Sequence, residues 1–468
     1  MALPIIFLLG SRFRHRVGWI VAIAFCGSFS GFASLIPEVQ SQGFIVEALP
    51  WIQQVQSFFG FRLDGVSLPL ALLTTFIGAL VAIYSIAYME KEHNPMAYNI
   101  YILLFITGIL NVFLSIDLIM FYLFWEFMLI PSFFLISEWG TGQSTRIAIK
   151  YFIITHIGAL FLLIGIIVMG INAGTTELTR LQSIIADGLI SQEAMLTSTV
   201  LMTVGFAVKM AVFPLHIWLP DAHAEAPTPI SVLLSGLMVK TGAYGLLRLS
   251  LIISPETMSA ISLPALIIAV VTMIYGGLMA LAQHDIKRLL AYSTISQMGY
   301  IAFGFSELSL LGFIGSFFHV IFHGISKSVL FMAAGILMKR TGLRDLRELA
   351  GQGRQLPFTA LAFAISAFTL AGIPPLGGFL SEWMIFSGGF SSGQYLLSTI
   401  AVLQSVLTIT YYLLPIARLF LNKAPPITLQ KSSILMILPM LLLTALNLIL
   451  PFFFTPLFSF LETTILPN

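Results

Sequence analysis

Lysines inside apolar stretches are the feature that most constrains this chain. Residues 206–249 carry Lys209 and Lys240 within runs that are long enough to span a bilayer. An ammonium group at the centre of a bilayer costs at least about 2.5 kcal/mol, even on the most lenient insertion scale. Such a residue is kept where another group pairs with it, hydrates it or uses its charge. The sequence therefore points to a membrane protein that moves ions.

Composition indicates the same class of protein. Of the 468 residues, 58% are hydrophobic and only 9% are charged, whereas soluble globular chains carry about 25% charged residues. The single cysteine, Cys26, excludes a disulfide within the chain and a cysteine-ligated iron–sulfur cluster, which needs about four thiolates. The sequence contains no phosphate-binding glycine motif, which argues against a nucleotide site.

The apolar runs predict about fourteen transmembrane helices, and therefore an all-α polytopic membrane protein. The first run is short, and the arginines that follow it reverse the charge order of a signal peptide. Residues 37–65 are mixed in composition and are expected to lie at the membrane surface. The predicted helices span residues 1–11, 17–36, 66–89, 97–115, 117–137, 146–171, 197–219, 230–252, 261–283, 289–307, 310–338, 357–390, 394–421 and 432–457.

Lysines and arginines divide unevenly between the two sides of the predicted helices. Sixteen of the 22 fall in loops after odd-numbered helices. Because cytoplasmic loops are enriched in these residues, we expect the odd-numbered loops in the cytoplasm and both termini on the outer face of a cell inner or plasma membrane. Three more, Arg62, Arg180 and Arg248, fall in loops after even-numbered helices. The remaining three, Lys209, Lys240 and Lys327, lie inside helices.

Two predicted helices are interrupted by proline and glycine. Helix 7 is broken around Pro214, and helix 12 is broken at AGIPPLGG, residues 371–378. The two breaks are five helices apart, so the two segments run in opposite directions, and each has an ionisable group nearby, Lys209 or Glu382. Interrupted helices at matching positions of two inverted halves indicate a transporter-type ion site. Two ordinary proline kinks are the alternative.

Glu126 and Lys240 are further candidates for ion movement. Glu126 lies near the middle of helix 5, and a pair with Lys209 would partly offset the desolvation of both groups. Its alternative role is a fixed hydrogen-bond anchor between helices. Lys240 is flanked by Gly236 and Gly242, which let helices or water approach closely. Snorkelling of Lys240 to the membrane surface is the alternative.

Helix 11 carries three titratable residues on one face. His319, His323 and Lys327 are spaced i, i+4 and i+8, so their side chains lie one above the other. This spacing favours a hydrated proton relay. Chelation of a metal by the two histidines and structural hydrogen bonding are the alternatives.

The two breaks carry candidates for the two ends of a proton path. Glu382 follows the helix 12 break and is read as a gate towards one surface, or else as a capping carboxylate. His216 lies after the helix 7 break and begins a cluster with Asp221, His223 and Glu225. The cluster is expected to line a cytoplasmic entrance, because flanking prolines and the absence of cysteines argue against a zinc site.

The chain resembles the antiporter-like subunits of respiratory complex I and of related quinone- and hydrogenase-type complexes. The resemblance covers nearly the whole chain and is carried by FAVKMAVFPLHIWLPDAHAEAPTPISVLLSGLMVKTGAYGLLR, FYLFWEFMLIPSFFLI, LAQHDIKRLLAYSTISQMGYI and AGIPPLGGFLSEWMIF. At the helix 12 break, Glu382 resembles the residue that M-type chains, the counterparts of mitochondrial chain 4, carry at this position. Two residues depart from that pattern. Many M-type chains carry histidine at the position of Gln297, and Lys327 is more typical of L-type and antiporter relatives.

The resemblance implies two inverted five-helix repeats, helices 4–8 and 9–13, with helices 7 and 12 broken. It implies a Glu126–Lys209 pair, a central Lys240, a helix 11 histidine at His323 and a terminal charge at Glu382. It also implies no redox cofactor or metal in this chain, and other membrane subunits, including further antiporter-like chains, as partners. The domains would be residues 1–96 with helices 1–3, residues 97–252 and 253–421 with the two repeats, and residues 422–468 with helix 14.

These expectations describe the proton-translocating, non-redox subunit of an NADH:quinone-type oxidoreductase. Protons would enter near His216, reach Lys209, pass to Lys240, follow the helix 11 relay and leave by way of Glu382. The second hypothesis is a subunit of a multisubunit sodium/proton antiporter or of a hydrogenase-linked ion pump. A third is a membrane scaffold whose charges only fix helix packing.

Overall fold

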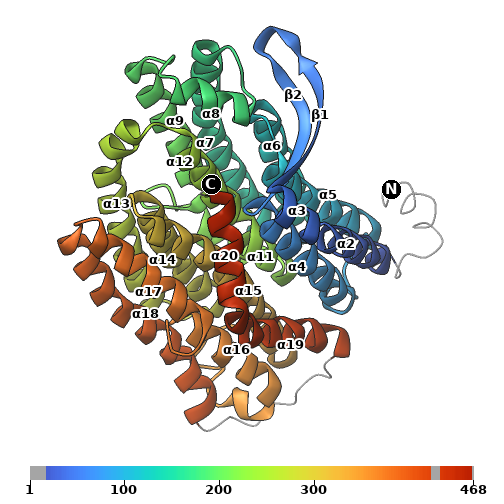
Figure 1. Cartoon of the computed structure of the whole chain (residues 1–468). Helices are drawn as coiled ribbons and strands as arrows, with labels where there is room; N and C mark the ends of the chain where they lie inside the picture. Colours follow the sequence, from blue (N-terminus) through green and yellow to red (C-terminus); the bar gives the residue numbers. More distant parts are fainter. Residues whose placement is uncertain (1–16, 423–432, 466–468) are drawn as a thin grey trace.

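The computed structural model describes residues 17–422 and 433–465. The predicted first helix, residues 1–11, lies outside the described residues. Within them, eleven helices are long and apolar enough to cross a membrane. The predicted class, an all-α polytopic membrane protein, is confirmed (Figure 1).

The N-terminal part joins two apolar helices through a β-hairpin. Residues 37–65, expected at the membrane surface, contain two antiparallel strands that pair from Phe44 with Asp64 to Ile52 with Ser57. The strands were not predicted, because their mixed composition has no clear period of two. The elements are α2 (Val17–Ser34), α3 (Ile36–Gln42), β1 (Phe44–Ile52), η2 (Gln53–Val55), β2 (Ser57–Asp64) and α4 (Ser67–Tyr88).

The next part runs from α5 to α12, and local signals set where its helices begin. The side chains of Asn94, Asp117 and Ser191 accept hydrogen bonds from the first free backbone N–H groups of α5, α6 and α9. The elements are α5 (Pro95–Leu114), α6 (Leu118–Trp139), α7 (Ser144–Ala173), α8 (Leu178–Ala186), α9 (Gln192–Met210), α10 (Leu219–Glu225), α11 (Thr228–Leu233), the π-helical turn η3 (Leu234–Met238) and α12 (Val239–Ile252).

The last part is arranged around α15, whose apolar stretch is buried along its whole length. This helix packs against α14, α16, α17, α19 and η3. The elements are α13 (Pro255–Leu281), α14 (Ile286–Ser306), α15 (Leu310–Thr341), η4 (Gln352–Gln355), α16 (Pro357–Leu370), α17 (Gly377–Ser391), α18 (Tyr395–Leu421), α19 (Ile434–Ile449), η5 (Leu450–Phe453) and α20 (Phe454–Ile465).

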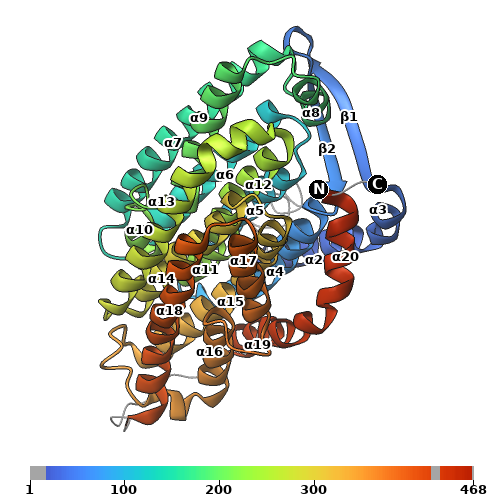
Figure 2. The ribbon, with the colours of Figure 1, turned by 60° about the vertical axis from the view of Figure 1, so that its left-hand side comes forward.

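The predicted last helix, residues 432–457, is not one straight helix. It divides into α19 and α20 around the short turn η5, which contains Pro451. Figures 1 and 2 both show α20 rising at a steep angle from the end of α19. Proline removes a backbone donor and clashes with the preceding turn, which accounts for the change of direction.

Loops after the even-numbered predicted helices meet at one end of the molecule, here called the hairpin face. Asp117 accepts hydrogen bonds from the Phe58 backbone at 3.2 Å and from the Thr176 hydroxyl at 2.8 Å. Arg180 donates to the Gln56 side chain at 3.0 Å. Figure 2 shows the hairpin beside α8 at this end.

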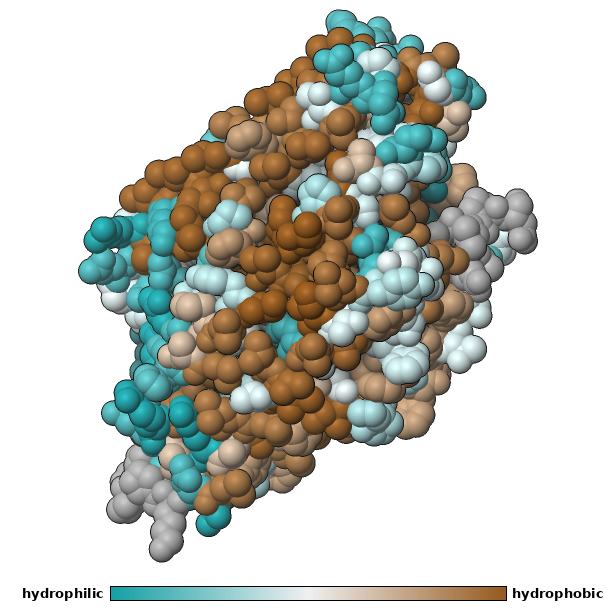
Figure 3. Space-filling model, turned by 90° about the vertical axis from the view of Figure 1, so that its left-hand side faces the viewer, coloured by the Kyte–Doolittle hydropathy of each residue, from teal (hydrophilic) through white to brown (hydrophobic). Residues whose placement is uncertain are grey.

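Loops after the odd-numbered predicted helices meet at the other end, here called the basic face. The Asp221 carboxylate bridges Lys150 at 2.8 Å and Arg288 at 2.9 Å. Arg344 pairs with Asp285 across two further loops. Between the two faces the surface is largely hydrophobic, as Figure 3 shows, with exposed isoleucines and leucines on α7, α13 and α18.

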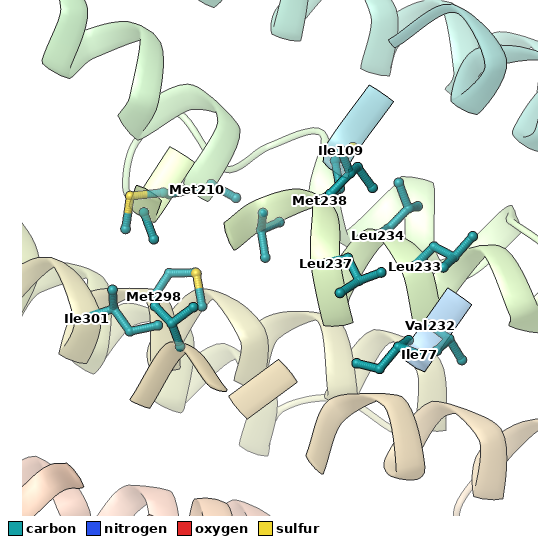
Figure 4. Packing of buried hydrophobic residues seen from close by; sticks show 14 of the residues in the cluster. Ile77, Ile109, Met210, Val232, Leu233, Leu234, Leu237, Met238, Met298 and Ile301 are labelled. Atoms are coloured by element: carbon teal, nitrogen blue, oxygen red, sulfur yellow. The ribbon is translucent and has the colours of Figure 1, made fainter. Parts of the chain in front are cut away.

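Apolar side chains seal the space between the two halves of the helix bundle. Figure 4 shows side chains of α11 and η3 between those of α4 and α5 on one side and those of α9 and α14 on the other. Each labelled residue is at most 1% exposed: Ile77, Ile109, Met210, Val232, Leu233, Leu234, Leu237, Met238, Met298 and Ile301. Ionisable side chains in this region therefore depend on partners within the protein.

A buried carboxylate connects the hairpin to the helices. Asp64, at the end of β2, is fully buried and contacts Arg62 at 2.9 Å and Arg248 of α12 at 2.7 Å. Its Oδ1 also accepts the backbone N–H of Ser67 at 2.9 Å. Burial alone would raise the pKa of the Asp64 carboxyl, but Arg248 and Arg62 hold this pKa well below its usual range.

Replacing Asp64 with asparagine should strongly destabilise the chain. Removing one partner of a buried ion pair costs about 3–5 kcal/mol, because the arginines stay buried without a counter-charge. Because the carboxyl pKa is depressed on folding, this contribution is complete above the unfolded pKa of about 3.9 and is lost only at lower pH. Thermal unfolding in detergent at pH 7 measures the loss. The control is Asp345→Asn, at an exposed Arg347 pair. Equal melting temperatures for the two variants would contradict the anchoring role of Asp64.

Candidate functional site

The structure contains both predicted helix breaks. In the first, α9 ends at Met210, Ala211 adopts a left-handed φ of 57°, and the chain turns through Pro214 before α10. In the second, α16 ends at Leu370 and α17 begins at Gly377 after a turn that contains Gly372 with φ 66°. Each turn contains a cis peptide bond before a proline. Lys209 lies in the last turn of α9, and Glu382 lies in the second turn of α17.

Lys240 and His323 are in direct contact at the centre of the molecule. The Lys240 Nζ lies 2.6 Å from His323 Nδ1 and also donates to the Ser235 carbonyl in the π-helical turn. A Cβ added at Gly324 would stand 3.0 Å from the Gly236 carbonyl oxygen, so both glycines allow α15 and η3 to approach closely. π-Helical turns are frequent at functional sites, and this one supplies a carbonyl oxygen to the buried ammonium.

His319 continues the line from His323 towards the second break. The two imidazole rings lie 6.3 Å apart. His319 Nε2 lies 2.7 Å from the Gln297 Oε1 of α14, and its Nδ1 lies 2.9 Å from the Ser381 hydroxyl of α17. Ser381 directly precedes Glu382, which is 4% exposed. Gln297 carries no titratable proton, so its amide orients His319.

Lys327 turns away from this line. Its Nζ donates to the Leu290 carbonyl of α14 at 2.9 Å and to the Ser293 hydroxyl at 2.5 Å, and it lies 5.5 Å from the centre of the Tyr412 ring. The predicted face of α15 is thus buried, but Lys327 is held by α14. In the part of the chain that the structure describes, no group of three or more His, Cys, Asp or Glu side chains could hold a metal ion.

The implied ion pair between Glu126 and Lys209 is not formed. Glu126 Oε2 lies 2.8 Å from His156 Nδ1 of α7 instead. Lys209 Nζ has no hydrogen-bond partner among the described residues and lies 5.2 Å from the centre of the Trp125 ring. Neighbouring side chains on a helix point about 100° apart. Because Trp125 takes the inward direction, Glu126 points towards α7.

The Glu126–His156 pair lies on an outward surface. The two side chains are 22% and 41% exposed, respectively. They are surrounded on α6 and α7 by exposed apolar residues, among them Ile130 and Ile153. Sequence reasoning missed His156, and the only signal for it was a lone histidine in the apolar run of α7.

The expected entrance cluster divides into separate environments. His216 is 4% exposed and packs against Tyr275 of α13 at 4.6 Å between ring centres. His223 is fully buried, and its ring lies 4.8 Å from that of Phe331 on α15. Asp221 belongs to the basic face. The four residues therefore do not form one metal-like group.

Lys287 is a second buried residue that sequence reasoning missed. It is 3% exposed and donates to the carbonyl oxygens of Ala226 and Ala224, at the end of α10. In the sequence it falls among the charged loop residues, because it stands next to Arg288 in a short charged segment between two apolar runs. Tertiary packing of the segment after α10 over the start of α14 buries it.

Family comparison gives this arrangement a context. The family model described as "NADH:quinone oxidoreductase/Mrp antiporter, TM" matches residues 115–408. A second family model, described as "NADH-Ubiquinone oxidoreductase (complex I), chain 5 N-terminus", matches residues 51–98. The chain belongs to the NADH:quinone oxidoreductase/Mrp antiporter transmembrane family. The longer match contains all eight predicted relay and entrance residues: Glu126, Lys209, His216, Lys240, His319, His323, Lys327 and Glu382.

The curated relatives include chains named as oxidoreductase or dehydrogenase subunits and chains named as antiporter subunits. NAD(P)H-quinone oxidoreductase chain 4 2 of Thermosynechococcus vestitus is 34% identical over 82% of this chain and 73% of its own length. F(420)H(2) dehydrogenase subunit M of Methanosarcina mazei is 32% identical over 78% and 74%. The putative antiporter subunit mnhA2 of Staphylococcus saprophyticus is 35% identical over 92% of this chain, which spans 57% of that relative's length.

Solved structures share the fold. The Mrp complex from Dietzia sp. DQ12-45-1b contains a chain that superposes with a TM-score of 0.90 at 23% identity, over 99% of this chain and 95% of that one. A chain of respiratory complex I from Thermus thermophilus superposes with a TM-score of 0.85 at 24% identity, over 95% and 94%.

Substituting alanine for Gly378 should disrupt the second break. A Cβ at this position would stand 1.7 Å from the Thr369 carbonyl oxygen, so α17 would have to shift against α16. Such overpacking costs about 1–3 kcal/mol, occasionally more. Gly27→Ala in α2 is the control, because nothing lies within 4 Å of the added methyl group. Thermal unfolding in detergent compares the variants. A Gly378→Ala melting temperature at or above that of Gly27→Ala would refute the tight packing.

Proposed function

We propose that this chain is a proton-translocating membrane subunit of a complex I-like redox complex. In this proposal residues 97–252 and 253–421 act as two inverted half-channels. The observation that carries it is the contact between Lys240 Nζ and His323 Nδ1 inside an apolar core. The pair joins one half of the family's fold to the other.

Proton transfer at the centre follows from the contact atoms. A charged Lys240 donates one N–H to the Ser235 carbonyl and directs another at His323 Nδ1. Transfer breaks the N–H bond at Nζ and forms one at Nδ1, which leaves a neutral amine and a charged imidazole. His323 Nε2 has no hydrogen-bond partner among the described residues, so it is the atom from which the proton moves on to His319.

Uptake and release use the two breaks. Protons enter from the basic face near His216 and reach Lys209, which lies against Trp125 and has no hydrogen-bond partner among the described residues. They leave through His319 and Ser381 to Glu382 on α17. Lys327, anchored on α14, modulates the charge on the relay. The proposal takes the basic face as cytoplasmic and both termini as lying outside a cell inner or plasma membrane, in line with the distribution of lysine and arginine.

Energy for transport must come from partner subunits. Moving one charge against the membrane potential requires about 2.3 kcal/mol per 100 mV, and this chain's own residues suggest no redox centre or cofactor. The partly exposed Glu126–His156 pair on α6 and α7 suits contact with another membrane chain, because ionisable groups in a membrane normally face protein or water. Other membrane subunits, including further antiporter-like chains, are the proposed partners.

A sodium/proton antiporter subunit is the second candidate. The 35% identity to the staphylococcal antiporter subunit over most of this chain favours it. Purification of the chain from native membranes with everything bound to it separates the two. Iron–sulfur and flavin or hydrogenase chains in the particle support the redox pump. Small membrane chains alone support the antiporter.

Replacing Lys240 with alanine should reduce proton transport at least tenfold in the assembled complex. Lys240→Arg should also impair it, because a guanidinium hardly releases its proton. Dye-monitored proton uptake into membrane vesicles, driven by NADH or by a sodium gradient, measures the rate. Lys91→Ala, at an exposed residue of the basic face, should leave it unchanged. Normal transport in an assembled Lys240→Ala complex would refute the central role of Lys240 and favour a scaffold.

A further inference from the structure

One buried carboxyl has no part in the path described so far. Glu307 lies in the turn between α14 and α15 and is 1% exposed. Neither carboxylate oxygen has a hydrogen-bond partner, and no ion pair reaches it, among the residues that the structure describes. A buried carboxylate without donors is unfavourable, and burial raises the pKa of Glu307 to about 9. The side chain therefore holds a proton at neutral pH.

Three glycines make the space that this carboxyl occupies. A Cβ added at Gly312 of α15 would stand 1.3 Å from Oε1, and one at Gly388 of α17 would stand 2.0 Å from the same atom. A Cβ at Gly389 would stand 3.1 Å from Oε2. Any larger residue at Gly312 or Gly388 would displace the carboxyl, so these two helices form a pocket for it.

Polar groups lead from His319 to this pocket. Ser316 lies one turn before His319 on α15, and a Cβ at Gly304 of α14 would meet both the Ser316 hydroxyl and the Gly312 carbonyl oxygen. The Ser398 hydroxyl of α18 borders Gly389, as Glu307 does. Both hydroxyls are buried and have no hydrogen-bond partner among the described residues. Ser316, Glu307 and Ser398 thus extend the polar line beyond His319.

Glu307 also lies at the correct end of the molecule for release. α14 begins beside Asp285 of the basic face and runs for 21 residues, which at about 1.5 Å per residue is about 30 Å, the thickness of a bilayer core. Its end is therefore on the hairpin-face side. The next residue, Leu308, is 52% exposed, so the carboxyl lies just beneath the surface.

We propose that Glu307 is the proton-release residue of this chain, receiving protons from the His319–Glu382 region and passing them to water on the hairpin face. This inference rests on the proposed function. On release, the O–H bond of the carboxylic acid breaks and the proton binds to water outside. The carboxylate that is left takes up the next proton from the relay, and no electron is transferred.

Glu307→Gln in the full complex tests the proposal, because glutamine keeps the shape of the side chain but has no acidic proton to transfer. The readout is the initial rate of dye-monitored proton transport in vesicles, driven by NADH or by a sodium gradient. We expect at least a tenfold loss in Glu307→Gln and partial recovery in Glu307→Asp. The control is Glu177→Gln, also buried near the hairpin face, where the carboxylate only caps α8.

The outcomes separate this inference from the proposed function. A Glu307→Gln rate within twofold of the unaltered chain, with Lys240→Ala inactive, overturns the role of Glu307 alone. Transport that survives Lys240→Ala overturns the proposed function. If Glu307→Gln fails to assemble, infrared difference spectra of the working complex decide. A carboxylic acid band that shifts in Glu307→Asp supports the proposal, and an unshifted band overturns it.

Discussion

Buried cations held by neutral partners are the constraint on which the rest of this structure depends. Lys240 bonds to a backbone carbonyl and an imidazole, and Lys327 bonds to a carbonyl and a hydroxyl. Neutral acceptors satisfy N–H groups that would otherwise be buried at high cost. They do not hold the charge as a carboxylate would, so a proton can leave without breaking a buried ion pair, which costs several kcal/mol. The arrangement suits transfer better than storage.

Close packing of helices makes these contacts possible. Gly236 and Gly324 bring the π-helical turn η3 against α15, and the same approach sets Lys240 at hydrogen-bond distance from His323. The apolar stretch of α15 is buried, and the helix packs against helices that precede and follow it in the chain. The relay is therefore built on a closely packed helix, in which side chains sit in well-defined rotamers.

Much of this arrangement could be predicted because apolar length and proline placement are local signals. Both breaks were predicted from proline and glycine, and α15 was predicted as a helix with three titratable residues on one face. The Glu126–Lys209 contact was wrong, because the direction of Glu126 depends on Trp125 filling the space beside it. His156, Lys287 and Glu307 were missed, since a polar residue within or next to an apolar run looks the same in the sequence whether it is buried or exposed.

The sequence by itself determined that this chain is a multi-helix membrane protein with charges inside its helices, because hydropathy and the cost of a buried ammonium act on each segment separately. It also indicated the two breaks, since a proline inside a helix removes a backbone donor and clashes with the preceding turn. Only the tertiary structure decided which charges meet. Lys240 and His323 are 83 residues apart in the chain, and Glu307 is enclosed by glycines of two other helices. Such contacts arise from packing between helices, and no local pattern encodes which side chain will fill a given space.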